Sequence, residues 1–184
     1  MLLRSSRPHD VPEGPALYLH PTLGSIELSW LQLDLEPSPT ADLLADLTDG
    51  LADAAECWRP VLRHDPQRRW YTRLVHTDLV EVWLLGWTPG QQVPAHDHGG
   101  AAGAFTVVHG TLVEDQLDLS TWSPRRRTSF PAGSRTGFGP EHAHILGNHG
   151  TRPATSVHAY SPPGLPLRFG SAGHASAGPL GAAR

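Results

Sequence analysis

The sequence predicts an all-β-dominated fold, a small jelly-roll-like β-barrel preceded by a helical segment. Nineteen glycines and 18 prolines punctuate the 184 residues, which leaves room mainly for short strands and turns. One helix-like segment is followed, from Trp70 onward, by a series of short stretches rich in β-branched and aromatic residues. The length suits one domain with a sizeable core and is too short for two comfortable ones.

The helical segment is predicted at residues 39–58. Thr40 stands at the N-cap position, where its hydroxyl can accept a hydrogen bond from the first turn. Apolar residues then recur at helical spacing, at Leu43, Leu44, Leu47, Leu51 and Ala55. Gly50 weakens the middle of this helix.

The strands are predicted from the stretches that follow. Residues 69–78 and 79–90 are rich in aromatic and β-branched residues, and each ends at a turn signal. Residues 104–120 are expected to form a hairpin-like pair around Gly110. Further short strands, separated by Gly and Pro, are expected up to Pro163.

We expect three parts along the chain. Residues 1–14 are predicted to be a flexible arm, residues 15–168 a single domain, and residues 169–184 a disordered tail. The tail is made almost entirely of Gly, Ala, Ser and Pro, a composition that cannot bury enough apolar surface to offset the entropy of ordering.

The composition excludes several classes of protein. Fourteen Lys and Arg against 18 Asp and Glu give a formal charge of −4, so no basic field indicates nucleic acid as a partner. No apolar run reaches the length of a membrane span, and the N-terminus lacks an apolar signal core, which predicts a cytoplasmic protein. Cys57 is the single cysteine, which rules out an intrachain disulfide and a thiolate metal cluster.

A pair of histidines offers the first chemical signal. His96 and His98 are one residue apart, so on a strand both imidazoles point to the same face and can bind one transition metal together. Such a pair can also be a set of surface polar residues near a turn. A second polar face, made by Ser156, His158 and Tyr160, would need partners if it pointed into a barrel.

The spacing of Gly90, His96 and His98 resembles the first motif of the cupin barrels. Gly110 stands where that motif ends, and Gly103 occupies the position that usually carries a glutamate ligand.

A second cupin motif follows downstream. It has a glycine eleven residues before its histidine and an asparagine four residues after it, a spacing met by Gly133, His144 and Asn148. This register favours His144 over His142 as the third ligand.

Within the cupins, the chain is similar to the cysteine dioxygenase family over roughly residues 70–163. The resemblance rests on "YTR" at 71–73, "HDH" at 96–98, a three-histidine set without glutamate, and "SVHAYSPP" at 156–163. The joint order and spacing of these pieces make it specific, and it implies a cupin fold.

The resemblance also implies roles for individual residues. The family's iron ligands correspond to His96, His98 and His144. The family also has a serine, a histidine and a tyrosine next to the metal ligands, and the histidine orients the catalytic tyrosine. These residues correspond to Ser156, His158 and Tyr160. The arginine that binds the substrate carboxylate corresponds to Arg73. Mammalian members carry at the position of Gly103 a cysteine that is cross-linked to the tyrosine, a bond this chain cannot make.

The predicted chemistry follows from charge. Three neutral imidazoles leave Fe²⁺ with its full +2 charge, so an anionic thiolate substrate is well neutralised there, and Gly103 is expected to leave space where a glutamate would reach the metal. We therefore expect an Fe(II)-dependent thiol dioxygenase that converts L-cysteine and O₂ to cysteine sulfinic acid. The alternatives are 3-mercaptopropionate or another small thiol as substrate, and a cupin that binds metal without turnover. The sequence gives no oligomeric state.

Overall fold

The computed structural model describes residues 17–24 and 39–170, which form two antiparallel β-sheets and a short helical layer. The six-stranded sheet has the order β1, β2, β3, β10, β5, β8, at Leu17–Leu19, Trp70–Thr77, Glu81–Trp87, Ala154–Ser161, Ala102–His109 and Arg135–Phe138. The five-stranded sheet has the order β11, β4, β9, β6, β7, at Arg168–Phe169, Gln92–Asp97, Ala143–Gly147, Thr111–Leu117 and Pro124–Pro131.

The helical segment forms as two helices, α1 at Ala41–Asp53 and α2 at Ala55–Trp58, with short 3₁₀ turns at Pro21–Leu23 and Arg59–Val61. The predicted N-cap is confirmed, because Thr40 Oγ1 accepts a hydrogen bond of 3.3 Å from the amide of Leu43. Gly50 stays inside α1, and the break falls instead at Ala54.

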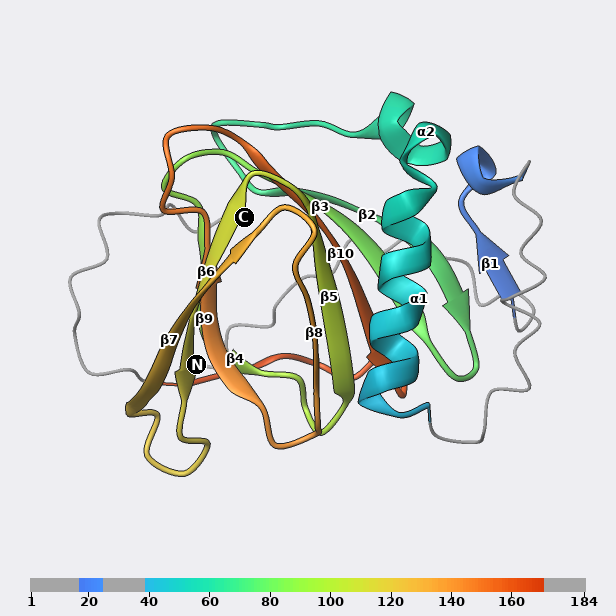
Figure 1. The fold of residues 1–184 in the computed structure, drawn as a ribbon. Coiled ribbons are helices and arrows are strands. Elements are labelled where there is room, and N and C mark those ends of the chain that lie inside the picture. Colours follow the sequence, from blue (N-terminus) through green and yellow to red (C-terminus); the bar gives the residue numbers. More distant parts are fainter. Residues whose placement is uncertain (1–16, 25–38, 171–184) are drawn as a thin grey trace.

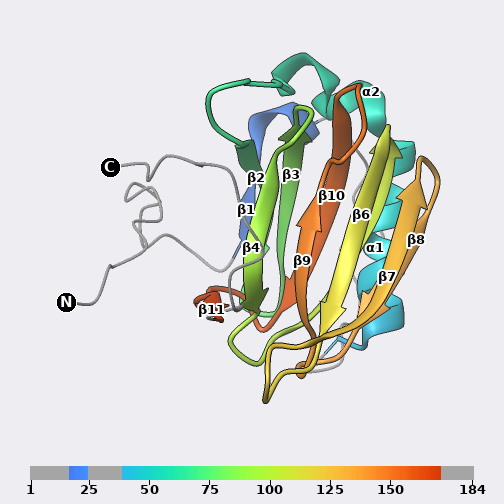
Figure 2. The ribbon, with the colours of Figure 1, turned by 90° about the vertical axis from the view of Figure 1, so that its left-hand side faces the viewer.

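Helix α1 covers the outer face of the six-stranded sheet, over β5, β8 and β10 (Figure 1). Turning the molecule brings the five-stranded sheet to the front and leaves α1 behind both sheets (Figure 2). The layers are therefore helix, six-stranded sheet and five-stranded sheet, which agrees with the predicted jelly-roll architecture.

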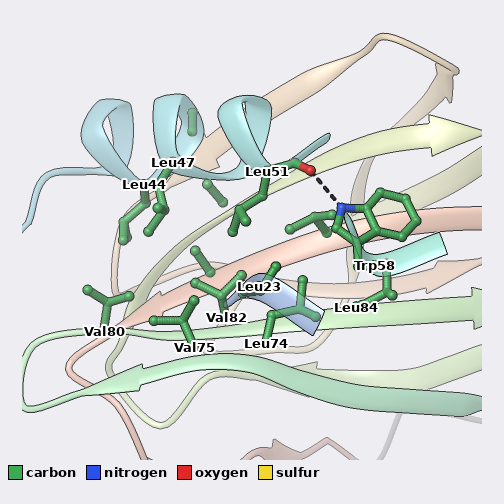
Figure 3. Packing of buried hydrophobic residues seen from close by; sticks show 14 residues of the cluster. Leu23, Leu44, Leu47, Leu51, Trp58, Leu74, Val75, Val80, Val82 and Leu84 are labelled. Carbon is green, nitrogen blue, oxygen red and sulfur yellow. Dashed lines mark hydrogen bonds between the residues drawn. The ribbon is translucent and has the colours of Figure 1, made fainter. Parts of the chain in front are cut away.

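Two apolar clusters hold these layers together. Between α1 and the sheet, Leu44, Leu47 and Leu51 pack against strand residues such as Val82, and the Trp58 indole N–H donates to the Leu51 carbonyl at 2.7 Å (Figure 3). Between the two sheets lies a second cluster, which contains Trp87, Val93, Phe105, Val107, Leu112, Phe138, Leu146 and Ala154. Side chains of β3 and β10 alternate between the two clusters, so every second residue points into the space between the sheets.

The expected hairpin around Gly110 is wrong. Strands β5 and β6 both form, but β5 belongs to the six-stranded sheet and β6 to the five-stranded sheet. Gly110 carries the chain from one sheet to the other with φ of 74°, and a Cβ there would lie 2.6 Å from the Pro153 carbonyl oxygen. A left-handed turn with no room for a side chain requires glycine, and periodicity alone could not tell this crossing from a hairpin.

The ends of the predicted domain fall near the limits of the described residues. The expected arm at 1–14 lies outside them, as does the tail from residue 171. Phe169 belongs to β11, which pairs with β4, and the amide of Gly170 donates to the Ala95 carbonyl at 3.0 Å. Among the described helices, none is long and apolar enough to cross a membrane.

Candidate metal centre and its cavity

Strands β4 and β9 bring the three predicted histidines together. His96 and His144 are directly paired across the two strands, and His98 follows the end of β4 on the same face as His96. Side-chain nitrogens of His96, His98 and His144 lie within 4.8 Å of one another, and all three residues are buried. These distances allow one metal ion to be bound by all three imidazoles.

Two of the imidazoles are held by their second nitrogen. The Nδ1–H of His96 donates to the Pro94 carbonyl at 2.8 Å, at a point where the pairing register of β4 shifts. The Nδ1 of His144 lies 2.7 Å from Oε1 of Glu114. With Nδ1 engaged in both rings, Nε2 is the nitrogen left for a metal, the arrangement by which protein ligands are commonly fixed.

His98 tests whether these residues fit a metal. Both of its ring nitrogens are buried, and within the described residues neither has a hydrogen-bond partner. Its ring is packed between those of Phe138 and Tyr160, at centroid distances of 4.8 and 5.0 Å. A buried imidazole without a partner is unfavourable, and a metal ion is the partner that this donor set accepts.

Burial also keeps the three rings in the form that binds metals. Burial, reinforced by the neighbouring histidines, lowers the pKa of His96 and the pKa of His98 well below the ordinary value. Burial lowers the pKa of His144 as well, although Glu114 opposes this. Neutral imidazoles have a free lone pair, so the site is ready to accept a cation without first losing protons.

Glu114, which the sequence analysis missed, lies directly behind this site. Its Oε1 is 2.7 Å from His144 Nδ1 and 2.9 Å from His142 Nε2. Burial alone would raise the pKa of Glu114, but hydrogen bonds from the two histidines outweigh it and hold the pKa at about 2. The residue is therefore a carboxylate, and it places one negative charge beside a metal-site histidine.

Glu114, His142 and His144 could by themselves also surround a cation. His144 however belongs to both groups, and its Nδ1 already lies 2.7 Å from Glu114, which leaves its Nε2 for an ion shared with His96 and His98. The signal for Glu114 was present in the sequence, because it lies two residues after Leu112 and therefore shares that residue's inward face of β6.

The polar face of β10 points into the same interior and forms a hydrogen-bonded chain. The Trp87 indole N–H donates to Ser156 Oγ at 2.9 Å, and Ser156 Oγ lies 2.8 Å from His158 Nε2. His158 Nδ1 lies 3.2 Å from the Tyr160 hydroxyl. Each member orients the next, and Tyr160 stands at the end that reaches the cavity.

Protonation states in this chain follow from burial. Burial lowers the pKa of His158 to about 3, and the positive charge of Arg69 acts in the same direction after that of His144. Burial, reinforced by the negative charge of Glu81, raises the pKa of Tyr160 above its usual value. At neutral pH the pair therefore consists of a neutral imidazole and an intact phenol, which can donate a hydrogen bond.

Gly103 is the direct partner of Tyr160 across β5 and β10. The expectation that this glycine leaves open space beside the metal is wrong. A Cβ built at position 103 would lie 2.6 Å from ring atoms of Phe138 and 2.9 Å from Cδ1 of Tyr160. Aromatic rings fill the volume that a glutamate side chain would need, so they exclude a fourth protein ligand from this direction.

A cavity of about 570 Å³ opens beside the centre. His98 and Tyr160 line its inner end, while Trp83 and Leu85 of β3 form an apolar wall. Much of another side comes from the segment after β10, at residues 162–169. The structure thus brings a candidate metal site, a phenol donor and a largely apolar cavity together.

The two arginines near this cavity differ in position. Arg69 lines it, as does Tyr71. Arg73, the predicted carboxylate-binding residue, is absent from the lining within residues 39–170 and lies over the Trp83 ring at 4.6 Å, with Nη2 4.0 Å from Glu81 Oε2. Sequence reasoning missed Arg69, although it precedes Tyr71 by two positions and so shares the face of Tyr71 and Arg73.

Comparison with protein families gives one match. A family model described as "Cysteine dioxygenase type I" matches residues 31–168, which include every candidate site residue above. No curated protein matches the chain significantly.

Solved structures resemble the chain at the level of the fold. A Klebsiella pneumoniae protein described as uncharacterized, with a double-stranded β-helix domain, is 20% identical with a TM-score of 0.52, covering 60% of this chain and 90% of its own. A cupin family protein from Methanocaldococcus jannaschii is 14% identical with a TM-score of 0.45, covering 55% of this chain and 86% of its own. The first likeness supports the double-stranded β-helix architecture of the cupins.

Proposed function

Because the chain belongs to the cysteine dioxygenase type I family, a family of cupin-fold thiol dioxygenases, we propose that it converts L-cysteine and O₂ to cysteine sulfinic acid with Fe²⁺ as its metal. The observation that carries the proposal is His98. Its two buried, unpartnered nitrogens lie beside the other two histidines and next to a cavity that also contains a phenol donor.

In this proposal His96, His98 and His144 hold the metal, and the second hydrogen bonds of the first and last fix their ring orientation. Fe²⁺ bound there would supply a Lewis-acidic centre at which the substrate sulfur and O₂ meet. Both atoms of O₂ end on sulfur, so the thiol gains two oxygens and no other co-substrate is consumed. Three neutral ligands leave the charge of the cation for an anionic thiolate to neutralise.

Tyr160 is the residue we propose to act on the substrate side. Its phenol stays protonated, and its hydroxyl lies within reach of both His158 and the cavity. A fixed O–H donor in a largely apolar cavity stabilises negative charge more than the same donor would in water. His158 and Ser156 act through Tyr160, because their hydrogen bonds hold its position.

Oxygen consumption by the iron-loaded protein tests the proposal, with L-cysteine, 3-mercaptopropionate and cysteamine compared side by side. We expect the highest kcat/KM with L-cysteine and a product that contains both atoms of ¹⁸O₂. Faster turnover of 3-mercaptopropionate would identify that thiol acid as the substrate instead. Full metal loading without turnover of any thiol would indicate a metal-binding cupin without catalytic activity. A cytoplasmic location remains part of the proposal.

A further inference from the structure

We infer that the outer part of the cavity binds an apolar group carried by the thiol substrate, so that an apolar extension at the carbon end of the thiol strengthens binding. The inference rests on the proposed function and deepens it, because it names the class of thiol that the same metal centre would take. Two of the residues that carry it, Leu167 and Phe169, lie after the last motif of the family resemblance.

The first observation is the size of the cavity. Its volume of about 570 Å³ lies in the range of roughly 300–1,000 Å³ that is typical of pockets for drug-sized ligands. A cavity of about 150 Å³ already holds a molecule of benzene, and L-cysteine has only one more non-hydrogen atom. L-cysteine held at the inner end, beside His98 and Tyr160, would therefore leave most of the volume unfilled.

The second observation is that the exposed part of the lining carries no charge and includes large apolar side chains. Among residues 17–24 and 39–170, the exposed large apolar side chains are Tyr18, Tyr71, Leu167 and Phe169, and all of them except Tyr18 line the cavity. The three that line it are 40%, 38% and 53% exposed, and we call them the apolar rim. Single apolar residues scattered over a surface are ordinary, but three around one opening indicate a site for an apolar ligand.

The apolar rim is continuous with the metal centre. The Tyr71 ring packs edge-on against Trp83 with the ring centroids 5.8 Å apart, and Trp83 pairs with His158 across β3 and β10. From the five-stranded sheet, the Phe169 ring lies 6.1 Å from the His96 ring. A chain of a few carbon atoms, attached to a thiol whose sulfur is at the metal, would therefore reach the rim.

The charged side chains of the lining lie deeper than the rim. Glu81 is only 4% exposed, and it accepts a hydrogen bond of 3.1 Å from the Gly164 amide. The guanidinium carbon of Arg69 lies 5.2 Å from the ring of Trp87, which is completely buried. Both charges therefore act on the part of the cavity that holds the head group of a thiol, and a group that extends to the rim meets uncharged surface.

The chemistry identifies the ligand class as a thiol whose carbon end bears an uncharged alkyl or aryl group. The reaction is that of the proposed function: the S–H bond breaks, both atoms of O₂ bond to sulfur, sulfur supplies the electrons that reduce O₂, and the thiol proton leaves to solvent. The apolar group takes no part in these steps. Its burial removes apolar surface from water, so it contributes to binding and not to kcat.

A series of N-alkyl L-cysteinamides, from methyl to butyl, tests the inference in the iron-loaded protein. Every member has the thiol and amine of L-cysteine, and only the length of the apolar group changes. Anaerobic titration calorimetry measures Kd without turnover. We expect Kd to fall about two- to fourfold for each methylene that is buried, and the heat-capacity change of binding to become more negative along the series. In the presence of O₂, KM should fall in parallel while kcat changes little.

Leu167→Gln replaces one residue of the apolar rim by a polar residue of similar size. Tyr18→Gln is the matched control, because Tyr18 is similarly exposed, at 37%, but lies on β1 and is not part of the lining. The ratio of Kd for the methyl amide to Kd for the butyl amide should fall about threefold or more in Leu167→Gln and stay at the wild-type value in Tyr18→Gln. An undiminished ratio in Leu167→Gln would overturn the inference.

A Kd that does not change with alkyl length in the wild type would also overturn it, whether or not the variants fold. A chain ending at Gly170 serves as a further test. If only this shorter chain prefers the longer amides, the apolar rim binds residues 171–184 and not a group of the substrate, and the inference is wrong. In each case turnover of L-cysteine by the wild type leaves the proposed function standing, whereas a wild type that oxidises no thiol contradicts that function itself.

Discussion

The metal-site histidines and the two arginines lie on different sheets of the same interior, and they were predictable to different degrees. His96 and His144 come from β4 and β9 of the five-stranded sheet, where strand pairing fixes their backbones, and His98 directly follows the end of β4. Arg73 lies in β2 of the six-stranded sheet, and Arg69 directly precedes the first residue of that strand. The histidines meet as their spacing implies, whereas the arginines, which share one strand face, end in different surroundings.

The difference lies in the freedom of the side chains. An imidazole turns about two torsions, and for His96 and His144 a hydrogen bond on the second nitrogen removes that freedom. An arginine turns about four torsions and loses more entropy when fixed, so the nearest rings and carboxylates select its conformation. Sequence spacing can therefore predict which histidines meet, but it cannot predict the surroundings of two arginines on one strand face.

The largest expected effect comes from removing a metal ligand. Replacing His96, His98 or His144 with alanine should abolish stoichiometric iron and thiol oxidation, since two imidazoles hold the cation much more weakly than three. Iron content by atomic emission and oxygen uptake measure this. His149→Ala, at an exposed position, is the matched control and should keep both. Full iron in His144→Ala with loss of iron in His142→Ala would show that the ligand set is wrong.

Tyr160→Phe tests the phenol donor on the six-stranded sheet and leaves the three histidines unchanged. The variant loses the hydroxyl that lies 3.2 Å from His158 Nδ1 and keeps the aromatic ring that packs on His98. We expect kcat to fall about 100-fold, the effect of removing one donor from a preorganised site, with iron content unchanged. An unchanged kcat would restrict Tyr160 to a packing role.

Glu114→Gln tests whether iron binding by the three histidines depends on the negative charge next to His144. The amide is isosteric with the carboxylate but neutral, so His144 loses its charged acceptor. We expect iron affinity to fall about 10- to 100-fold, measured by competition with a chelator. The control is Glu141→Gln, at an exposed position three residues before His144, which should leave the iron affinity unchanged. Equal affinities for Glu114→Gln and wild type would mean that the negative charge behind His144 does not contribute to iron binding.

The sequence was sufficient for the double-sheet fold, the helix with Thr40 as its N-cap, and the three histidines that meet. It was insufficient where the answer depends on which sheet a strand joins, as at Gly110, because both arrangements show the same alternation. It was also insufficient at Glu114, whose inward position is readable from Leu112 but whose partner is 30 residues away in the chain. Long-range contacts of this kind are not encoded in local spacing.

Gly103→Ala should moderately lower the stability of the protein, because a side chain at this position would contact the rings of both Phe138 and Tyr160. The new methyl group would lie 2.6 Å from the Phe138 ring, and this ring packs on His98, so one of the rings must shift. We expect a loss of about 1–3 kcal/mol in unfolding free energy, typical of overpacking, seen as a fall of several degrees in Tm. The control is Gly139→Ala, because a Cβ there has open space around it, and Tm should change little. Gly133→Ala is less suitable, because its φ of 83° would strain an alanine.

The smallest expected effect comes from shortening the chain after β11, the edge strand that pairs with β4 next to His96. A chain ending at Gly170 keeps the pairing of β11 with β4, the Arg168 contact to Asp97 at 2.8 Å and the bond from the Gly170 amide to Ala95. Residues 171–184 are mostly Gly, Ala and Ser, so their removal should leave Tm, iron affinity and kcat nearly unchanged. A chain ending at Leu167 instead loses all three contacts next to His96, and we expect its Tm and iron affinity to fall measurably. Identical behaviour of the two truncations would show that β4 holds its ligands without an edge strand, whereas a large loss on ending at Gly170 would mean that residues 171–184 contact the domain or a second copy of it.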